Sequence, residues 1–304
     1  MIDIVTPESL SAISNHEQYL ARMSASSFFS TKQNIPPIIK SYGCKTVLDV
    51  GCADGSFTHR IACESQTIVT GIDINEKNID LAKKNHPEYA FVCSDLKNLN
   101  NRVIEIDKKP LTFDCIVFSS VLHEISSYDP DEKKRFTSKP IREAIELAAK
   151  HLNPNGILII RDGLKATSAF GFSAGDDFFA PEYRDLFHKF VDEFPPLKRG
   201  EELYPYNSPL SLHNGQFLYH EEIFMEFLML ATWGEESWSR EINERKFICN
   251  RGEWYNILFK NGFNVNSFTA TNEEYPRYCR KFLNNPYVWT MPSTTCLIVA
   301  QKKN

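Results

Sequence analysis

The chain has 304 residues, of which 42% are hydrophobic and 24% are charged, and its formal net charge is −5 at pH 7. These are ordinary globular values, and the length allows one core domain with an elaboration. No stretch approaches the roughly 20 apolar residues of a membrane span, and the N-terminus lacks the basic and apolar regions of a signal peptide. We therefore expect a cytoplasmic protein without membrane contact.

The eight cysteines form no C-x-x-C pair and no cysteine–histidine cluster at zinc spacing along the chain. We therefore expect no structural metal and no disulfide framework. Cys93, Cys115 and Cys296 fall in apolar runs, where a reduced cysteine packs as a small hydrophobe.

The chain begins with a helical pattern over residues 8–42, which Pro36-Pro37 interrupts. A buried strand is expected next at 47–50, because Val47, Leu48 and Val50 form a short apolar run. Gly51 and Gly55 then allow a tight turn, and a helix over 56–65 would direct its first amide groups at a ligand on the loop.

Two more strands end in acids. Residues 68–74 form a strand pattern with Asp73 near its end, where a carboxylate can accept hydrogen bonds from both hydroxyls of a ribose. Residues 90–93 lead to Asp95, which can accept from an adenine amino group. Only two glycines, four residues apart, occur in the preceding loop, so the three-glycine dinucleotide fingerprint is not met.

These segments resemble the ordered motif set of the class I S-adenosylmethionine-dependent methyltransferases. The matching segments are residues 47–57, 71–74, 94–96, 113–124 and 152–160. The resemblance implies an α/β fold, with a doubly wound and mostly parallel seven-stranded sheet whose last strand is antiparallel, and S-adenosylmethionine as cofactor. By this resemblance the cofactor-binding residues are Gly51, Cys52, Ala53, Gly55, Asp73, Ile74, Asp95, Leu96 and Ser119.

Two features qualify the match. Cys52-Ala53 stands where many members have Cys-Gly or Gly-Gly, and we expect a narrower loop that still admits the cofactor. In this family a leading segment often folds over the cofactor, so Arg22 is a candidate partner for the methionine carboxylate. The alternative is a solvated arginine on a helix face.

The sequence patterns after residue 250 predict a helix over 251–262, a strand over 263–268 and a last strand over 294–301. The expected organisation is an N-terminal helical cap (1–40), a methyltransferase core (41–163 and 251–304) and a lid or substrate-recognition insertion after the fifth strand (164–250). By topology the insertion lies at the carboxyl ends of the strands, where open α/β sheets bind ligands.

The insertion is acidic, with 15 Asp and Glu against 8 Lys and Arg. We expect most of these acids on solvated helix faces and some against a cationic substrate. A nucleic-acid groove needs a basic stripe, so a nucleic-acid partner is not expected. Polar aromatic and imidazole side chains in its irregular part are candidate substrate-binding residues, with ordinary loop packing as the alternative; they are Tyr204, Tyr206, His213 and His220.

A sulfonium methyl group is already activated, so the enzyme mainly aligns the acceptor and excludes water. His123, just past the fourth strand, is the candidate catalytic base or substrate-orienting residue, and the alternative is a histidine that packs on the cofactor without exchanging protons. The Asn/Asp-Pro-Pro-Tyr and Pro-Cys motifs of base-modifying members are absent from this strand end.

Three functions remain open. The first is transfer of a methyl group to a small molecule or short peptide. The second is RNA or tRNA methylation, with Arg277, Arg280 and Lys281 at the binding edge. The third is a non-catalytic module that holds the cofactor. The acceptor and the oligomeric state are not determined by the sequence.

Overall fold

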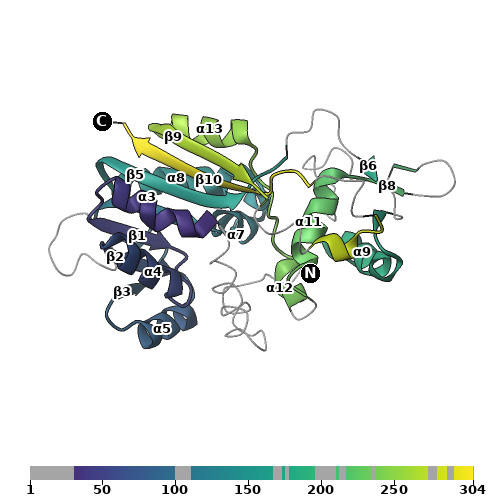
Figure 1. The fold of residues 1–304 in the computed structure, drawn as a ribbon, viewed down its shortest axis with the longest axis horizontal. Helices are drawn as coiled ribbons and strands as arrows, with labels where there is room; N and C mark the ends of the chain where they lie inside the picture. The colour runs from purple at the N-terminus through teal and green to yellow at the C-terminus, as the bar shows by residue number, and fades with distance from the viewer. Residues whose placement is uncertain are drawn as a thin grey trace.

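The structure is a computed structural model, which describes residues 31–99, 111–166, 173–174, 178–195, 210–211, 217–234, 237–272, 279–285 and 291–303. Figure 1 shows a large sheet flanked by helices, with a second group of helices to its right. The strands of this sheet are β1 (Thr46–Val50), β2 (Ile68–Asp73), β3 (Ala90–Cys93), β4 (Phe113–Ser119), β5 (Leu152–Gly163), β9 (Phe263–Thr271) and β10 (Thr295–Lys302).

The sheet has seven strands in the order β3-β2-β1-β4-β5-β10-β9. The pairs from β3 to β5 are parallel, whereas β10 is antiparallel to both β5 and β9. The predicted α/β fold, with its last strand antiparallel, is therefore confirmed. The strand order reverses at β1, between β2 and β4, and ligands of doubly wound sheets bind at such a point.

Both faces of the sheet are covered, because neighbouring residues of one strand belong to different cores. Val47 packs in the core beneath α3 (Ile35–Ser41) and α4 (Ser56–Ser65). Leu48 packs on the other side, with residues of α8 (Ser138–His151) and α13 (Arg251–Lys260). Burial on both faces explains the continuous apolar run of β1.

The helix predicted at 56–65 is observed as α4, with identical bounds. The fifth strand is longer than predicted, because β5 continues to Gly163, which pairs with Thr295 of β10. Likewise β9 continues to Thr271, which pairs with the same residue of β10. Cross-strand pairing, which local sequence does not show, lengthens both strands.

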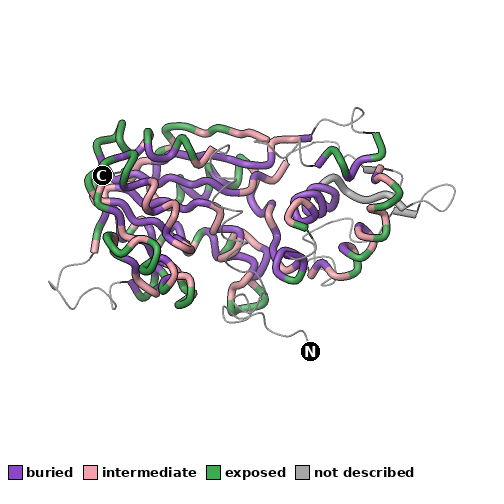
Figure 2. The backbone as a smooth tube through the Cα atoms, turned by 60° about the horizontal axis from the view of Figure 1, so that its bottom comes forward, coloured by how far each residue is buried: buried purple, intermediate pink, exposed green. Residues whose placement is uncertain are grey.

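A second hydrophobic core lies outside the sheet, among α9 (Pro181–Glu193), α11 (Glu221–Ala231), α12 (Trp238–Glu241) and η7 (Arg280–Phe282). The rings of Phe187 and Phe224 stack with centroids 5.3 Å apart. The core also contains Phe282 and Met291, so the connection between β9 and β10 packs with the segment 164–250. Figure 2 shows buried backbone in both regions.

Short elements complete the described chain. They are η2 (Thr31–Asn34), α5 (Glu76–Asn85), α7 (Leu122–Ser127), η3 (Glu132–Lys134) and a small antiparallel sheet of β6 (Ser173–Ala174), β8 (Phe217–His220) and β7 (Leu210–Ser211). Among the described helices, none has the length and apolar character needed to cross a bilayer.

Candidate active site

The loop after β1 turns sharply at Gly51, whose φ is +76°. A Cβ at this position would lie 2.6 Å from Val121 Cγ2, so the loop and the segment after β4 approach each other closely. The amides of Gly51 and Cys52 both donate to the carbonyl of Ile72, at 2.8 and 3.0 Å. The loop is therefore held against the end of β2, at the point where the strand order reverses.

Ala53 adopts a left-handed conformation with a φ of +48°. Such a conformation costs a non-glycine residue about 1–2 kcal/mol. The strained backbone is held in part by a hydrogen bond from the Ala53 amide to Asp73 Oδ2, at 3.1 Å. This conformation gives a physical reason for the glycine that many members of the family have here.

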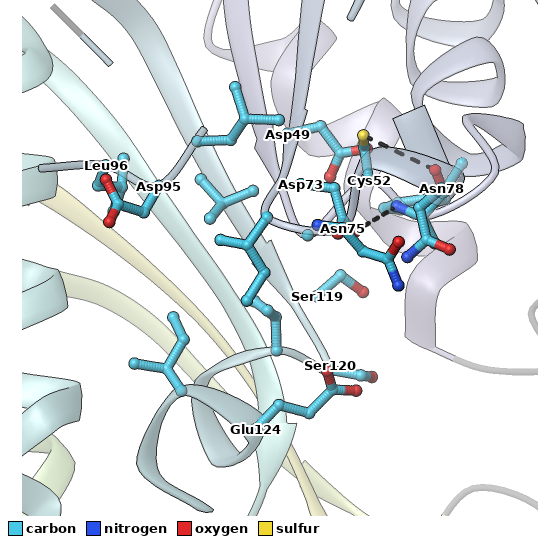
Figure 3. Close-up of a pocket in the computed structure, with 18 of the residues that line it drawn as sticks. Asp49, Cys52, Asp73, Asn75, Asn78, Asp95, Leu96, Ser119, Ser120 and Glu124 are labelled. Atoms are coloured by element: carbon cyan, nitrogen blue, oxygen red, sulfur yellow. Dashed lines mark hydrogen bonds between the residues drawn. The ribbon is translucent and has the colours of Figure 1, made fainter. Parts of the chain in front are cut away.

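Asp73 ends β2 and lines the cavity above the loop (Figure 3). Its carboxylate also accepts from the amide of Asn75, at 2.8 Å. Burial raises the pKa of Asp73, and the hydrogen bonds from Asn75 and Ala53 oppose this effect. Asp73 thus stabilises the loop while facing the predicted ribose position.

Asp95 follows β3 and is exposed at the cavity wall. Its carboxylate accepts from the amide of Asn98 at 2.7 Å and from the Asn98 side chain at 3.2 Å, which fixes the turn. Leu96 is buried beside it, while Ile74 is 56% exposed, and both line the cavity. All nine described residues predicted to bind the cofactor lie at the ends of β1 to β4, and those that line the cavity are Gly51, Cys52, Ala53, Asp73, Ile74, Asp95, Leu96 and Ser119.

Gly55, the remaining predicted residue, is the N-cap of α4 with a φ of +78°. A Cβ there would lie 2.7 Å from the Phe91 ring and 3.1 Å from Ala82 Cβ. Its role in the described structure is close packing of α4 against α5 and β3.

The cavity has a volume of about 880 Å³, which is large for a ligand site. It extends beyond the strand ends to α7, α8 and Arg240. Eight acidic and four basic side chains line it, which favours a cationic ligand such as a sulfonium over a polyphosphate. The acids are Asp49, Asp54, Glu64, Asp73, Asp95, Glu124, Asp129 and Glu143, and the bases are Lys32, Arg60, Lys97 and Arg240.

The end of β4 is also strained. Ser120 has a φ of +61°, and its amide donates to the Arg161 carbonyl at 2.7 Å. Its hydroxyl accepts from the Arg161 guanidinium. Strained residues concentrate at functional sites, and Ser120 lies on the cavity wall beside Ser119 (Figure 3).

His123 lies in α7 and is only 8% exposed, and it is not among the residues that line the cavity. Its Nδ1 lies 2.7 Å from Asp162 Oδ1. Burial alone would lower the pKa of His123, but the Asp162 carboxylate outweighs it, and the net effect raises this pKa to about 10. With this pKa, His123 holds its proton at neutral pH, and its role as catalytic base stays a prediction.

A buried ion network joins α7 to α12 and the chain that follows it. Glu244 Oε1 accepts from Arg240 Nε at 3.2 Å and from the Tyr128 hydroxyl at 3.1 Å. Lys246 Nζ contacts Glu244 and lies 2.9 Å from Glu241 Oε2. Most acids of the insertion are predicted on solvated helix faces. Glu241 and Glu244 are instead buried and paired, because the insertion packs on the active-site edge.

Glu124, next to His123, faces the cavity with a partly exposed side chain (Figure 3). Its Oε1 lies 3.2 Å from Arg240 Nη2. Burial, followed by the nearby Glu244 charge, raises the pKa of Glu124 to about 7, although Arg240 opposes the shift. A carboxyl group with this pKa can exchange a proton near neutral pH.

Several predicted residues lie outside the described part of the chain. Arg22, Tyr204, Tyr206 and His213 are among them, and for His220 only the backbone, in β8, is described. Conversely, the sequence did not identify Glu124 and Arg240 as site residues. Glu124 adjoins His123, which was a usable signal, but Arg240 lies 116 residues away from Glu124 and nothing local connects them.

The sequence family described as a methyltransferase domain matches residues 48–158. No curated protein matches the chain. A structure of the plantazolicin methyltransferase BpumL in complex with SAH is similar, with a TM-score of 0.50 and 12% identity over 98% of this chain and 94% of that one.

Two further structures are similar. BpumL in complex with a pentazolic desmethylPZN analog and SAH has a TM-score of 0.50 and 12% identity, over 98% of this chain and 95% of that one. SAM-bound CalS10, an amino pentose methyltransferase from Micromonospora echinaspora, has a TM-score of 0.49 and 13% identity. The similarity covers 95% of this chain and 97% of that one.

The matched residues contain the loop after β1, both acidic strand ends and the end of β4, and they form the parallel part of the sheet. At these identities the two BpumL structures speak for the fold, and the family match speaks for residues 48–158. These residues match a methyltransferase domain, and the seven-stranded sheet around them has the class I methyltransferase fold.

Proposed function

We infer that the protein transfers the methyl group of S-adenosylmethionine to a small-molecule or short-peptide acceptor by in-line displacement. The observation that carries this proposal is the extent of the cavity. It continues from the cofactor motifs, past Glu124 at the end of the fourth motif, to Tyr128 and Arg240, which belong to none of them. BpumL, which shares the fold, is described in complex with a pentazolic desmethylPZN analog and SAH together.

The residues present fit the cofactor. Gly51 permits a close backbone approach, and the acidic lining suits a cationic sulfonium. Asp73 would accept from the ribose and Asp95 from the adenine amino group. The bound cofactor supplies an activated methyl group, and the chain's own residues hold the acceptor in line with it and exclude water.

Glu124, rather than His123, is the proposed proton acceptor. Its carboxylate faces the cavity, its pKa is raised to about 7, and Arg240 fixes its orientation. His123 is a positioning residue in this proposal. Asp162 Oδ2 accepts from the amides of Leu122 and His123, at 2.8 and 3.3 Å, so the Asp162–His123 pair holds the start of α7 and thereby Glu124.

The proposed organisation keeps a helical cap (1–40), a core (41–163 and 251–304) and a lid (164–250). Cys279, Phe282, Leu283 and Met291 pack in the second core and are proposed to belong to the lid structurally. Arg22 in the cap, together with Tyr204, Tyr206, His213 and His220 in the lid, remain predicted ligands of cofactor and acceptor.

The test uses S-adenosylmethionine labelled on its methyl group and fractionated cell extract as the source of acceptors. We expect label in small-molecule or short-peptide fractions and calorimetric binding of S-adenosylhomocysteine. Label confined to RNA would favour the RNA methyltransferase alternative. Binding without transfer to any fraction would favour the non-catalytic module.

A further inference from the structure

A cluster of metal-ligand side chains lies outside the methyl-transfer site, between α4 and the turn from α5 to β3. His59 and Cys63 are four residues apart in α4 and therefore lie on one face of the helix. His86 is the C-cap of α5, and Glu88 follows in the turn. His59 Nδ1 lies 3.5 Å from Glu88 Oε1, and His86 Nδ1 lies 4.0 Å from the same atom.

These separations are close to those expected between ligand atoms of one zinc ion. Tetrahedral zinc with bonds of about 2.0–2.1 Å places its nitrogen and oxygen ligands roughly 3.3 Å apart. One ligand atom from each of His59, His86 and Glu88 lies within 4.8 Å of the others. Cys63 Sγ lies 3.8 Å from His59 Nδ1, the same nitrogen that approaches Glu88, so a thiolate donor lies next to this set.

The cluster needs a modest rearrangement to bind an ion. The His59 and His86 rings are stacked, with centroids 4.6 Å apart and planes at 14°. Since a metal lies in the plane of each ring that it binds, at least one ring must turn. The side chains of His59 and Glu88 are 43% and 52% exposed, which leaves room for that rotation.

A second group of potential metal ligands, His123, Glu124 and Glu244, is less suited to an ion. There Lys246 Nζ contacts Glu244 and lies 3.5 Å from His123 Nε2, so a cation already occupies the position.

We propose that His59, His86 and Glu88 form a zinc-binding site, with Cys63 supplying the fourth ligand. Cysteine and histidine spacing along the chain predicts no metal site, because His59 and Cys63 belong to α4, whereas His86 and Glu88 follow α5. Zinc suits two imidazoles, a carboxylate and a thiolate, and four protein ligands are typical of structural sites.

The site would fasten α4 to the turn before β3. Gly55, at the start of α4, already packs tightly against Phe91 of β3 and Ala82 of α5. His59, Cys63 and His86 also line the large cavity, so the ion would stabilise the rim of the cofactor site.

Titration of the chelator-treated full chain with Zn²⁺, followed by calorimetry, tests the proposal. We expect one equivalent to bind with a dissociation constant of about 1 μM or tighter and to raise the melting temperature. His86→Ala and Glu88→Gln should each weaken binding about 100-fold or more. His188→Ala, at an α9 histidine outside the cluster, should bind as the wild type does.

Cobalt substitution tests the thiolate. Bound Co²⁺ should give the sulfur-to-metal charge-transfer absorption, and Cys63→Ser should remove it, whereas Cys93→Ser should keep it. Circular dichroism of each variant checks that it is folded. Weak binding at several sites, or stoichiometric binding that the His86 and Glu88 variants retain, would overturn the proposal. Neither readout uses methyl transfer or cofactor.

Discussion

His123 Nδ1 lies 2.7 Å from Oδ1 of Asp162, which ties the first turn of α7 to the end of β5. The imidazolium form of His123 is stabilised, because the pKa is raised to about 10. In the proposed function this pair positions the neighbouring Glu124, while a catalytic role of His123 itself stays a prediction.

The stability that the His123–Asp162 ion pair contributes should depend on pH. His123 has a folded-state pKa of about 10, against about 6.5 in the unfolded chain, so its ionic contribution to stability is complete below pH 6.5 and is lost as the pH rises toward 10. Asp162→Asn should lower the free energy of unfolding by about 3–5 kcal/mol at pH 6. Denaturant unfolding measures the difference in free energy of unfolding between Asp162→Asn and wild type. This difference should be smaller at pH 10 than at pH 6, and an equal difference at both pH values would contradict the charge state assigned to His123.

Glu124 should control the pH dependence of methyl transfer to an acceptor that arrives protonated. Burial and Glu244 raise the pKa of Glu124, while Arg240, His123 and Lys246 lower it, with a net value of about 7. Activity should rise as the pH increases through this value. Glu124→Gln should lower kcat about 10²- to 10⁴-fold and remove that limb of the profile.

A matched control is Glu146→Gln, because Glu146 is exposed and pairs with Lys150 on the surface of α8. This variant should keep the wild-type profile. Unchanged kcat and an unchanged limb in Glu124→Gln would show that Glu124 is not the proton acceptor.

Replacement of Asp73 by Ala should weaken cofactor binding. The lost charge-assisted hydrogen bonds correspond to about 1.5–3 kcal/mol, or roughly ten- to a hundredfold in affinity. Calorimetry with S-adenosylhomocysteine measures the change. Since Asp73 also holds the amides of Ala53 and Asn75, the melting temperature should be recorded alongside, and unchanged affinity would remove Asp73 from the ribose site.

Gly51→Ala should nearly abolish cofactor binding, because its Cβ would meet Val121 Cγ2 at 2.6 Å on a backbone with a φ of +76°. Gly43→Ala isolates the backbone effect, since Gly43 has a φ of +67° with nothing within 4 Å. That control should lose about 1 kcal/mol of stability and keep its affinity. Adding Val121→Ala to Gly51→Ala should recover part of the binding, and no recovery would exclude the clash as the cause.

Nucleic acid should not bind tightly. The chain carries a net charge of −5, and acids predominate around the cavity. An RNA substrate would give an affinity that falls with salt at a slope near −0.7 per contacted phosphate. Filter binding of total tRNA at low and moderate salt checks this, and tight, salt-sensitive binding would reverse the preference for a small acceptor.

Local residue patterns predict most elements of the sheet and the proposed cofactor-binding residues. The apolar runs and glycines of residues 46–96 predict strands and turns directly, because strand burial and positive φ depend on local residue type. Asp73 and Asp95 could be placed at one edge of the sheet, since the carboxyl ends of parallel strands meet there.

The buried ion pairs and the pKa shifts depend on tertiary packing. The acidic composition of the insertion predicts mostly solvated helix faces, yet Glu226 is 2% exposed and accepts from the amides of Lys246 and Phe247, both at 2.9 Å. His123 and Asp162 are 39 residues apart, and Arg240 lies 116 residues from Glu124. Such pairings depend on how separate elements pack, and packing sets the burial and neighbouring charges that shift each pKa.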